Sequence, residues 1–316
     1  MKALATLTPT ESKKLISQAI LAFPGFQEAW RDGIVAIHPS SNTYFLYEAL
    51  TGQRVEGTWV SGVVTPRGLC VSKESLEGRI RHAAPGSGPR DPLSLRTNWF
   101  FKKGCLQEST ALGEIIDQMT ERDFYIKGAN AVDPAGNVAV LFGNPAGGGG
   151  TIGKVIVAQR RIGFQLLLPI GLEKLIPVPV ATAAQKVSFG KIDRAMGLPC
   201  GLIPVPGRKI DEVDALTLLS GAEVTPVAAG GLGGAEGSIV LAINGADEQV
   251  EKAFEICRSV KGTRLPELNL LDCEICWRVG CHFAVKSRDP HPPRAGSAPG
   301  GSCMGVIFLD KNRQVG

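Results

Sequence analysis

Long hydrophobic runs and tracts of a single charge are both missing from this 316-residue sequence, and aromatic residues make up only 6% of it. The strongest apolar stretch, residues 155–175, is interrupted by Arg160 and Arg161, so no transmembrane helix is expected. The first residues, MKALATLTPTESKKL, contain no apolar run of the length that a signal peptide needs. The 34 Lys and Arg exceed the 30 Asp and Glu by only four, and they are spread along the chain. We therefore expect a cytoplasmic protein that binds neither nucleic acid nor a membrane.

What the sequence has in excess is glycine, at 39 of 316 residues or about 12%. No Gly-X-Y period runs through the chain, so a collagen-like fibre is excluded. Hydrophobic residues make up 44% and charged residues 20%, which is typical of a globular protein. The glycines must therefore serve particular loops, and they concentrate at 128–153 and 230–237.

The first third of the chain has the pattern of an α/β fold. Residues 8–22 open with a Thr-x-x-Glu cap and then place apolar residues at helical spacing. The run GIVAIH at 33–38 predicts a buried strand, followed by a polar loop and a helix. Residues 123–170 repeat the pattern with apolar runs at DFYIK, NVAVLFG and FQLLLPIG around the helical stretch TIGKVIVAQRR. Such strands predict a parallel sheet covered on both faces.

After residue 190 the pattern changes to strand, helix, strand, strand, helix, with LPCGLIPV at 198–205 as the first strand. This order is that of a ferredoxin-like unit without its last strand. We therefore predict a Rossmann-like parallel-sheet domain at 1–190, a smaller ferredoxin-like α+β domain at 191–267, and a cysteine-bearing tail at 268–316. The glycines at 230–237 would form a flexible hairpin or lid between two strands of the small domain.

The glycine loop between a strand and a helix is typical of an anion site. Glycines let successive backbone N–H groups converge on an anion at a helix N-terminus, without β-carbons in the way. The alternative is a tight turn without a ligand. The candidate ligand-binding residues in this loop are Asn144, Gly147, Gly148, Gly149, Gly150, Thr151 and Lys154.

Residues 148–154 also fit the first seven positions of a P-loop, G-x-x-x-x-G-K. The eighth position is Val155 rather than Ser or Thr, so the magnesium ligand is missing. Nucleotide hydrolysis is therefore disfavoured, and Lys154 is either an anion contact or a solvated helix lysine.

Three segments resemble the superfamily of ribose-5-phosphate isomerase, glucosamine-6-phosphate deaminase and CoA transferases, which includes the LUD (lactate utilization) domain. They are GIVAIHPSSNT, IKGANAVDPAGNV with its GGGG loop, and LLLPIGLEKLIP. The resemblance implies a Rossmann-like fold and a small second domain. By this resemblance, the isomerase's Gly-Ala-Asp-Glu motif corresponds to residues 128–131, and its Ser-Lys pair corresponds to Glu173 and Lys174. The pattern of Gly128 to Ala131 is closest to the LUD branch.

The departures from that superfamily concern its chemistry. The isomerase's acidic pair falls on Lys127 and Asn130, and no Asp or Glu occurs from Pro134 to Leu172. Proton shuttling between carbons needs a base within hydrogen-bond reach, so sugar-phosphate isomerisation by that mechanism is disfavoured. A CoA transferase needs a nucleophilic glutamate, for which only Glu173 or Glu236 is available.

Other polar groups are candidates for the same cleft. Ser40, Ser41, Asn42 and Thr43 follow the first strand, where they either bind an anion or cap a helix. Candidate catalytic groups are His38, Lys127 and Asp133, although His38 also suits a core-edge histidine and Asp133 an ordinary Asp-Pro turn. Gly128, Asn130 and Lys174 complete the predicted ligand-binding set.

Eight cysteines without a signal peptide indicate reduced thiols or metal ligands rather than disulfides. Cys273, Cys276, Cys281 and Cys303 are candidate ligands for zinc or an iron–sulfur cluster, since four soft ligands fall within 31 residues. A second C-x-x-C pair is missing, so a redox thiol and unreactive reduced cysteines remain as alternatives.

The sequence therefore predicts a protein that binds, and in one alternative transforms, a small anionic metabolite that is phosphorylated or CoA-linked. Two other hypotheses stay open: a metal or redox protein that uses the C-terminal cysteines, and a non-catalytic sensor or assembly module. A homo-oligomer is left open as well.

Overall fold

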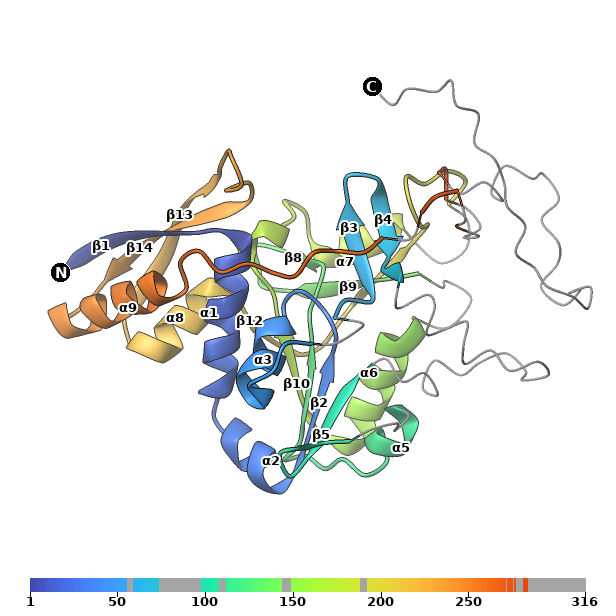
Figure 1. Cartoon of the computed structure of the whole chain (residues 1–316), viewed down its shortest axis with the longest axis horizontal. Coiled ribbons are helices and arrows are strands. Elements are labelled where there is room, and N and C mark those ends of the chain that lie inside the picture. Colours follow the sequence, from blue (N-terminus) through green and yellow to red (C-terminus); the bar gives the residue numbers. More distant parts are fainter. Residues whose placement is uncertain are drawn as a thin grey trace, which may run out of the picture.

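The computed structural model describes residues 1–55, 59–73, 98–107, 112–143, 149–187, 192–270, 272–274, 276 and 281–283. Its architecture is mixed α/β, with one six-stranded sheet and several small antiparallel sheets (Figure 1). The α/β class expected from the alternating apolar runs is confirmed.

The main sheet has the strand order β12-β10-β7-β2-β5-β6. Strands β2 (Ile34–His38), β7 (Phe124–Lys127), β10 (Gln165–Pro169) and β12 (Arg208–Ile210) run parallel, as the apolar runs of the first three predict, whereas β12 was not expected. β5 (Trp99–Lys102) and β6 (Cys105–Leu106) extend the sheet antiparallel beside β2. The sheet is therefore mixed, with a parallel core.

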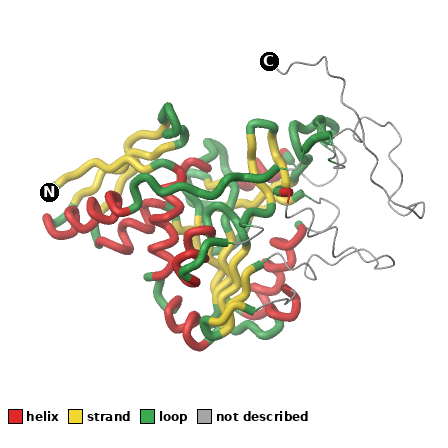
Figure 2. The backbone as a smooth tube through the Cα atoms, viewed as in Figure 1, coloured by secondary structure: helices red, strands yellow, loops and turns green. Residues whose placement is uncertain are grey.

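Helices cover both faces of this sheet (Figure 2). Helix α1 (Pro9–Leu21) starts at Thr8, whose side chain forms the expected capping box with Glu11, and packs with α3 (Tyr44–Thr51) on one face. Helices α5 (Leu112–Ile116) and α6 (Gly150–Ile162) pack on the other. Alternate residues of the strands feed the two cores: Ile37 and Ile126 face α1, whereas Ala36 and Tyr125 face α6.

Strand β9 (Val138–Phe142) does not join the parallel sheet, which corrects the expectation for NVAVLFG. It pairs antiparallel with β8 (Ala131–Val132) on one side and β11 (Gly201–Pro204) on the other. The β8–β9 connection is a tight turn, and a tight turn joins antiparallel strands rather than parallel ones. At Gly201 the phenyl ring of Phe142 lies where a β-carbon would stand, so the glycine permits this pairing.

The small antiparallel sheet has the order β1-β14-β13, formed by Lys2–Leu7, Ser238–Asn244 and Glu223–Gly230. The expectation that 198–205 supplies its first strand is wrong, because β11 pairs with β9 and the N-terminal strand β1 takes that place. Helices α8 (Glu212–Ser220) and α9 (Asp247–Ser259) pack with this sheet beside α1 (Figure 1). The sheets therefore do not divide at residue 190.

The remaining elements are α2 (Phe26–Asp32), the hairpin β3 (Gly62–Thr65) and β4 (Gly68–Val71), the short 3₁₀ helix η3 (Leu172–Lys174), and α7 (Val180–Lys186). The hairpin confirms the strand pair expected from WVSGVVTPRGLCVS. The predicted 230–237 connection joins β13 to β14. Across the described ranges, none of the helices has the length and apolar character required to cross a bilayer.

Candidate functional site

The candidate site lies at the carboxyl edge, defined here as the edge of the main sheet where β2, β7, β10 and β12 end. Ligands of open α/β sheets bind at such an edge, because loops and helix N-termini converge there. Many of the predicted polar residues lie at or after the ends of β2, β7 and β10. The carboxyl edge therefore brings together segments that lie up to 170 residues apart in the sequence.

Lys127 is the last residue of β7, and its side chain is only 7% exposed. Its amine makes no hydrogen bond or ion pair with any residue that the structure describes. Loss of water through burial lowers the pKa of Lys127 from 10.5 to about 7. Burying an ammonium without a partner costs free energy, so burial favours the neutral form of this amine.

The side chain of Lys127 lies on the α6 face of the sheet, because it alternates with Ile126 and shares the side of Tyr125. Only two residues separate α6 from β10, so the helix runs antiparallel to the strand. Thirteen helical residues span about 20 Å and five strand residues about 17 Å. The N-terminus of α6 therefore lies at the carboxyl edge, on the same face as Lys127.

The glycine loop that leads into α6 is described only from Gly149 onward. Gly149 caps the helix with a φ of 89°, a conformation that favours glycine, and no side chain caps the helix start. Gly150 and Thr151 form its first turn, and Lys154 lies one turn further along. The predicted residues Asn144, Gly147 and Gly148 lie outside the described residues.

His38 ends β2 and pairs in register with Lys127. Its Nδ1 lies 2.9 Å from Asn98 Oδ1, which also accepts a 3.0 Å hydrogen bond from the hydroxyl of Tyr125. Since this amide oxygen is an acceptor, Nδ1 of His38 is the donor. Burial raises the pKa of Tyr125, so its hydroxyl remains protonated. The imidazole is thereby held in a fixed orientation at the carboxyl edge.

The Ser40 to Thr43 turn uses most of its polar atoms internally. Thr43 Oγ1 donates to the carbonyl of His38 and accepts from the backbone N–H of Ser40, and the two hydroxyls lie 3.0 Å apart. Thr43 is fully buried, and only Ser40 and Ser41 retain partial exposure. The hydroxyls of Ser40 and Thr43 thus stabilise the turn, but no side chain caps the start of α3, so the capping alternative is not confirmed.

Asn42 and Lys174, both predicted as ligand-binding residues, are in contact. Lys174 Nζ donates to Asn42 Oδ1 at 3.0 Å, while Asn42 Nδ2 donates to the carbonyl of Pro169 at 2.6 Å. Burial lowers the pKa of Lys174 to about 8. A β-carbon at Gly128 would stand 2.5 Å from Ser40 Oγ and 3.2 Å from Asn42 Cβ, so β7 passes close to this turn. The bridge links the ends of β2 and β10.

Three charged residues beside this bridge form a charge cluster: Lys13, Glu173 and Glu212. Lys13 Nζ and Glu173 Oε1 are 2.7 Å apart, and Glu173 Oε2 is buried with no hydrogen-bond partner. Both oxygens of Glu212 accept from the N–H of Leu172. Burial first, then the charge of Glu173, raises the pKa of Glu212 to about 7.

The sequence singled out Glu173 alone among these three residues. Lys13 and Glu212 lie on helices whose apolar spacing predicts only packing, so no local pattern marks them. Their positions, Lys13 in the second turn of α1 and Glu212 at the start of α8, become informative only once the fold is known.

Asp133 and Asn130 act within the β8–β9 region. The Asp133 carboxylate accepts hydrogen bonds from Ala135, Asn137 and the backbone N–H of Val180 at the start of α7. These bonds, with Val180 first, lower the pKa of Asp133. Asn130 Oδ1 accepts from Leu141 N. The hydrogen bonds of Asp133 and Asn130 stabilise the β8–β9 region, and the catalytic role of Asp133 stays a prediction.

None of the described cysteines is joined in a disulfide. Cys273 Sγ lies 3.5 Å from Arg67 Nη1, and Cys281 is buried where its segment bridges Ala195. Among the residues that the structure describes, no group of three or more His, Cys, Asp or Glu side chains is arranged to hold a metal. Cys303, the fourth predicted ligand, lies outside them, so the metal hypothesis gains no support.

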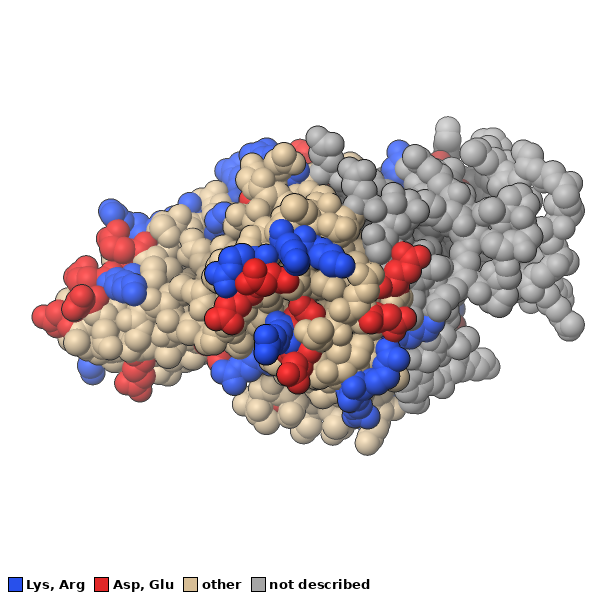
Figure 3. Space-filling view, turned by 90° about the horizontal axis from the view of Figure 1, so that it is seen from below, with Lys and Arg blue, Asp and Glu red and all other residues tan. Residues whose placement is uncertain are grey.

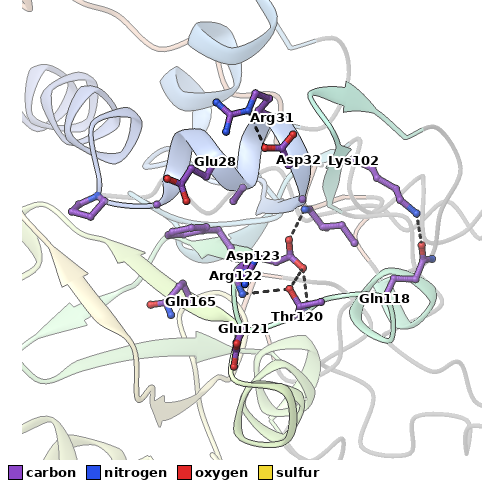
Figure 4. A pocket seen from close by; sticks show the side chains of 16 residues that line it. Glu28, Arg31, Asp32, Lys102, Gln118, Thr120, Glu121, Arg122, Asp123 and Gln165 are labelled. Atoms are coloured by element: carbon purple, nitrogen blue, oxygen red, sulfur yellow. Dashed lines mark hydrogen bonds and ion pairs between the residues drawn. The ribbon is translucent and has the colours of Figure 1, made fainter.

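A groove of about 540 Å³ lies at the opposite, amino edge of the sheet, between α2 and the turn before β7 (Figure 4). Asp123 at its floor accepts from Ile34 N and from Thr120, so its carboxylate is already satisfied. Basic and acidic side chains are interspersed on the underside of the molecule (Figure 3). The groove therefore lacks the unpaired buried group that marks the carboxyl edge.

Comparisons with known proteins give little further guidance. No family model matches the sequence, and no curated protein matches it. Among solved structures, ribose 5-phosphate isomerase from Plasmodium falciparum aligns with 82% of this chain and 88% of its own, at 12% identity and a TM-score of 0.22. Similarity at this level is weak and carries no argument about fold or reaction.

Proposed function

We propose that this chain binds a small anionic metabolite, phosphorylated or CoA-linked, at the carboxyl edge of its parallel sheet. The observation that carries the proposal is Lys127, a buried amine without a partner among the described residues, on the face where α6 begins. A positive helix end and an unpaired amine both favour an anionic guest.

The surroundings of Lys127 support the same ligand class. The first turn of α6 contains no acidic residue and no side-chain cap, so its N–H groups keep their capacity to donate. Elsewhere at the carboxyl edge, Lys174 follows β10 and adds a second partly buried amine, which donates to Asn42. A ligand with a phosphate or carboxylate group would offset the cost of burying these cations.

For the fold, we propose a Rossmann-like domain with a ferredoxin-like unit of α+β type. The order β1-β14-β13 with two helices supports the second part, since these strands pair as the first three strands of such a unit do. In this arrangement the main sheet is inserted between the first strand and the rest of the unit.

Thermal shift against a panel of anions tests the proposed function. The panel contains inorganic phosphate, several sugar phosphates and CoA, and a ligand at ~100 times its Kd should add about 2.7 kcal/mol to stability. Thr151→Asp places a negative charge in the first turn of α6, which favours the helix but repels a bound anion. Thr151→Asn is the matched neutral control.

We expect a shift for the wild type and for Thr151→Asn, and a strongly reduced shift for Thr151→Asp. If no member of the panel raises the Tm, or if both variants bind equally well, the α6 N-terminus is not an anion site and the proposal fails.

A further inference from the structure

We propose that Lys127 acts as an amine nucleophile that condenses with the carbonyl group of an aldehyde or ketone carrying a phosphate or carboxylate group. The inference rests on the proposed function, because the anion site at the start of α6 would hold the charged end of the same substrate. It deepens that function by naming the reactive group of the substrate.

The amine of Lys127 makes no hydrogen bond or ion pair with the residues that the structure describes. The other buried lysines have oxygen partners: Lys13 contacts Glu173 and the carbonyl of Pro9, and Lys174 contacts Asn42. Lys127 is as buried as Lys13 but has no partner in the described part of the chain. A salt bridge or hydrogen bond would keep an amine protonated and its lone pair unavailable, and neither constrains Lys127.

The protonation state of Lys127 also suits a nucleophile. Burial lowers the pKa of Lys127 to about 7, so roughly half of the molecules carry a neutral amine at pH 7. The positive end of the α6 dipole on the same face favours the neutral form further. An ordinary surface lysine is neutral in only about one molecule in a thousand at this pH. Lys127 therefore combines the features that activate lysine nucleophiles, namely desolvation and a nearby positive potential.

The chemistry balances without any additional reactant. The nitrogen lone pair attacks the carbonyl carbon, so a C–N bond forms as the C=O π bond breaks, and one nitrogen proton is transferred to the carbonyl oxygen. The C–O bond of the resulting carbinolamine then breaks, the hydroxyl leaves as water with the second nitrogen proton, and the nitrogen supplies the electron pair of the C=N bond. Overall, one amine and one carbonyl give one imine and one water, and nothing is oxidised or reduced.

His38 suits the proton transfers of this condensation. It is the register partner of Lys127 on β2, and adjacent parallel strands place such partners about 4.8 Å apart with side chains on the same face. The Asn98 contact fixes its ring, so the imidazole can deliver a proton at the same edge of the sheet. Asp133, whose oxygens already hold four donors, is not needed in this scheme.

Reductive trapping tests the inference. The full-length protein is incubated with glyceraldehyde 3-phosphate or glyoxylate, and sodium borohydride is added to reduce any imine to a stable secondary amine. Peptide mapping by mass spectrometry then locates the adduct. Neutral glyceraldehyde is the control for the anionic group, and Lys186, which is exposed at the end of α7, is the reference lysine.

We expect the adduct at Lys127, formed on the order of 100-fold faster than at the exposed reference Lys186 at pH 7, because burial leaves about half of the Lys127 amine neutral. Neutral glyceraldehyde should react more slowly at Lys127 and equally at Lys186. Lys127→Met and Lys127→Arg should abolish the mapped adduct, while Lys186→Met leaves it unchanged. In the wild type, labelling of Lys127 should rise with a midpoint near pH 7.

The outcomes separate this inference from the proposed function. Anion binding in the thermal shift without an adduct at Lys127 overturns the inference and leaves the proposed function standing. An adduct confined to exposed lysines, or one at Lys127 whose rate follows that of Lys186 at every pH, also overturns it. Loss of both the shift and the adduct overturns both.

Discussion

At the residue scale, the buried amine of Lys127 lowers the stability of the fold, although the proposed reaction requires it. An apolar side chain of similar length would make the folded state more stable at this buried position, because it needs neither water nor a counter-charge. Charged side chains that are buried without a partner lower stability, and they are expected at functional sites, where activity offsets the lost stability. This contrast gives a test that needs no knowledge of the substrate.

Lys127→Met should stabilise the unliganded protein by about 2–4 kcal/mol near pH 7, since a shift of one pKa unit corresponds to about 1.4 kcal/mol. The folded pKa is lowered to about 7, so between pH 7 and about 10.4 the unfolded chain binds more protons than the folded one. Wild-type stability therefore rises with pH in this window, and the advantage of the variant shrinks. Urea unfolding across that range measures the difference.

Lys186→Met is the control for this series, because Lys186 is exposed and its removal should leave stability within about 0.5 kcal/mol. A difference between wild type and Lys127→Met that does not change from pH 7 to pH 10 would show that the amine is not perturbed.

Asp133 is the opposite case, because its carboxylate already accepts hydrogen bonds from four donors. Asp133→Ala should cost about 2–3 kcal/mol, because three backbone N–H groups and the Asn137 amide lose a charged acceptor. The pKa of Asp133 is lowered, so its contribution is present above the unfolded pKa and lost as the pH falls through the folded one. Denaturant titrations at neutral and acid pH measure both effects.

Asp117→Ala is the matched control, since its ion pair with Arg161 is largely exposed and should be worth less than about 1 kcal/mol. If Asp133→Ala leaves stability unchanged but abolishes trapping at Lys127, the carboxylate has a catalytic role after all.

At the element scale, the end of β7 and the turn after β2 are packed too closely for any side chain at 128. Gly128→Ala should cost about 1–3 kcal/mol, because its β-carbon would meet Ser40 Oγ at 2.5 Å. The displaced turn carries Asn42, so the bridge to Lys174 should weaken and anion binding should fall as well. Gly143→Ala is the control, because a β-carbon added there would meet no described atom within 4 Å.

A Gly128→Ala variant with wild-type Tm and wild-type anion binding would show that the turn is free to move. Calorimetry and the anion thermal shift together measure both properties.

The elements themselves were largely predictable, but their partners were not. The Thr8 to Glu11 capping box, the helix after it, and the apolar runs that form β2, β7 and β10 follow from local spacing. By contrast, β9 has the same apolar character as β7 yet pairs in another sheet, since a run buried on both faces does not specify its neighbours.

The candidate site was predictable to the same degree. Asn42 was marked by its position after an expected strand, whereas Lys127 and Lys174 were marked by the resemblance to the isomerase motifs, and the fold brings Asn42 and Lys174 into contact. Nothing local distinguished Lys127 from an ordinary strand-end lysine, because its isolation depends on what surrounds it in three dimensions. Lys13 and Glu212 were missed for the same reason.

At the scale of the whole molecule, the small sheet and the main sheet share one hydrophobic core. Leu7 of β1 and Leu241 of β14 belong to the same cluster of buried side chains as Ile37 and Ile126 of the main sheet, with α1 between them. Strand β1 is the first segment of the chain, yet it pairs with a strand more than 230 residues later. Such a long-range contact couples the two ends of the described chain.

This shared core predicts a single cooperative unfolding transition. Trp30, Trp59 and Trp99 lie in the part built around the main sheet, and Trp277 lies outside the described residues. Tryptophan fluorescence of a Trp277→Phe variant therefore reports on that part, while far-UV circular dichroism also follows α8 and α9. The two signals should give one urea midpoint. Leu7→Ala should lower both midpoints together and cost about 2–5 kcal/mol, because the side chain is fully buried.

Leu232→Ala is the control, since Leu232 is 89% exposed in the β13–β14 connection and should change neither signal. Two separate midpoints, or a Leu7→Ala effect confined to the circular dichroism signal, would mean that the small sheet unfolds independently. The carboxyl edge would then keep its geometry without β1, because the contacts between Lys174 and Asn42 and the pairing of β2 with β7 belong to the main sheet. A single transition would instead mean that the carboxyl edge unfolds together with the N-terminal strand, to which it is connected through α1 and the salt bridge of Lys13 with Glu173.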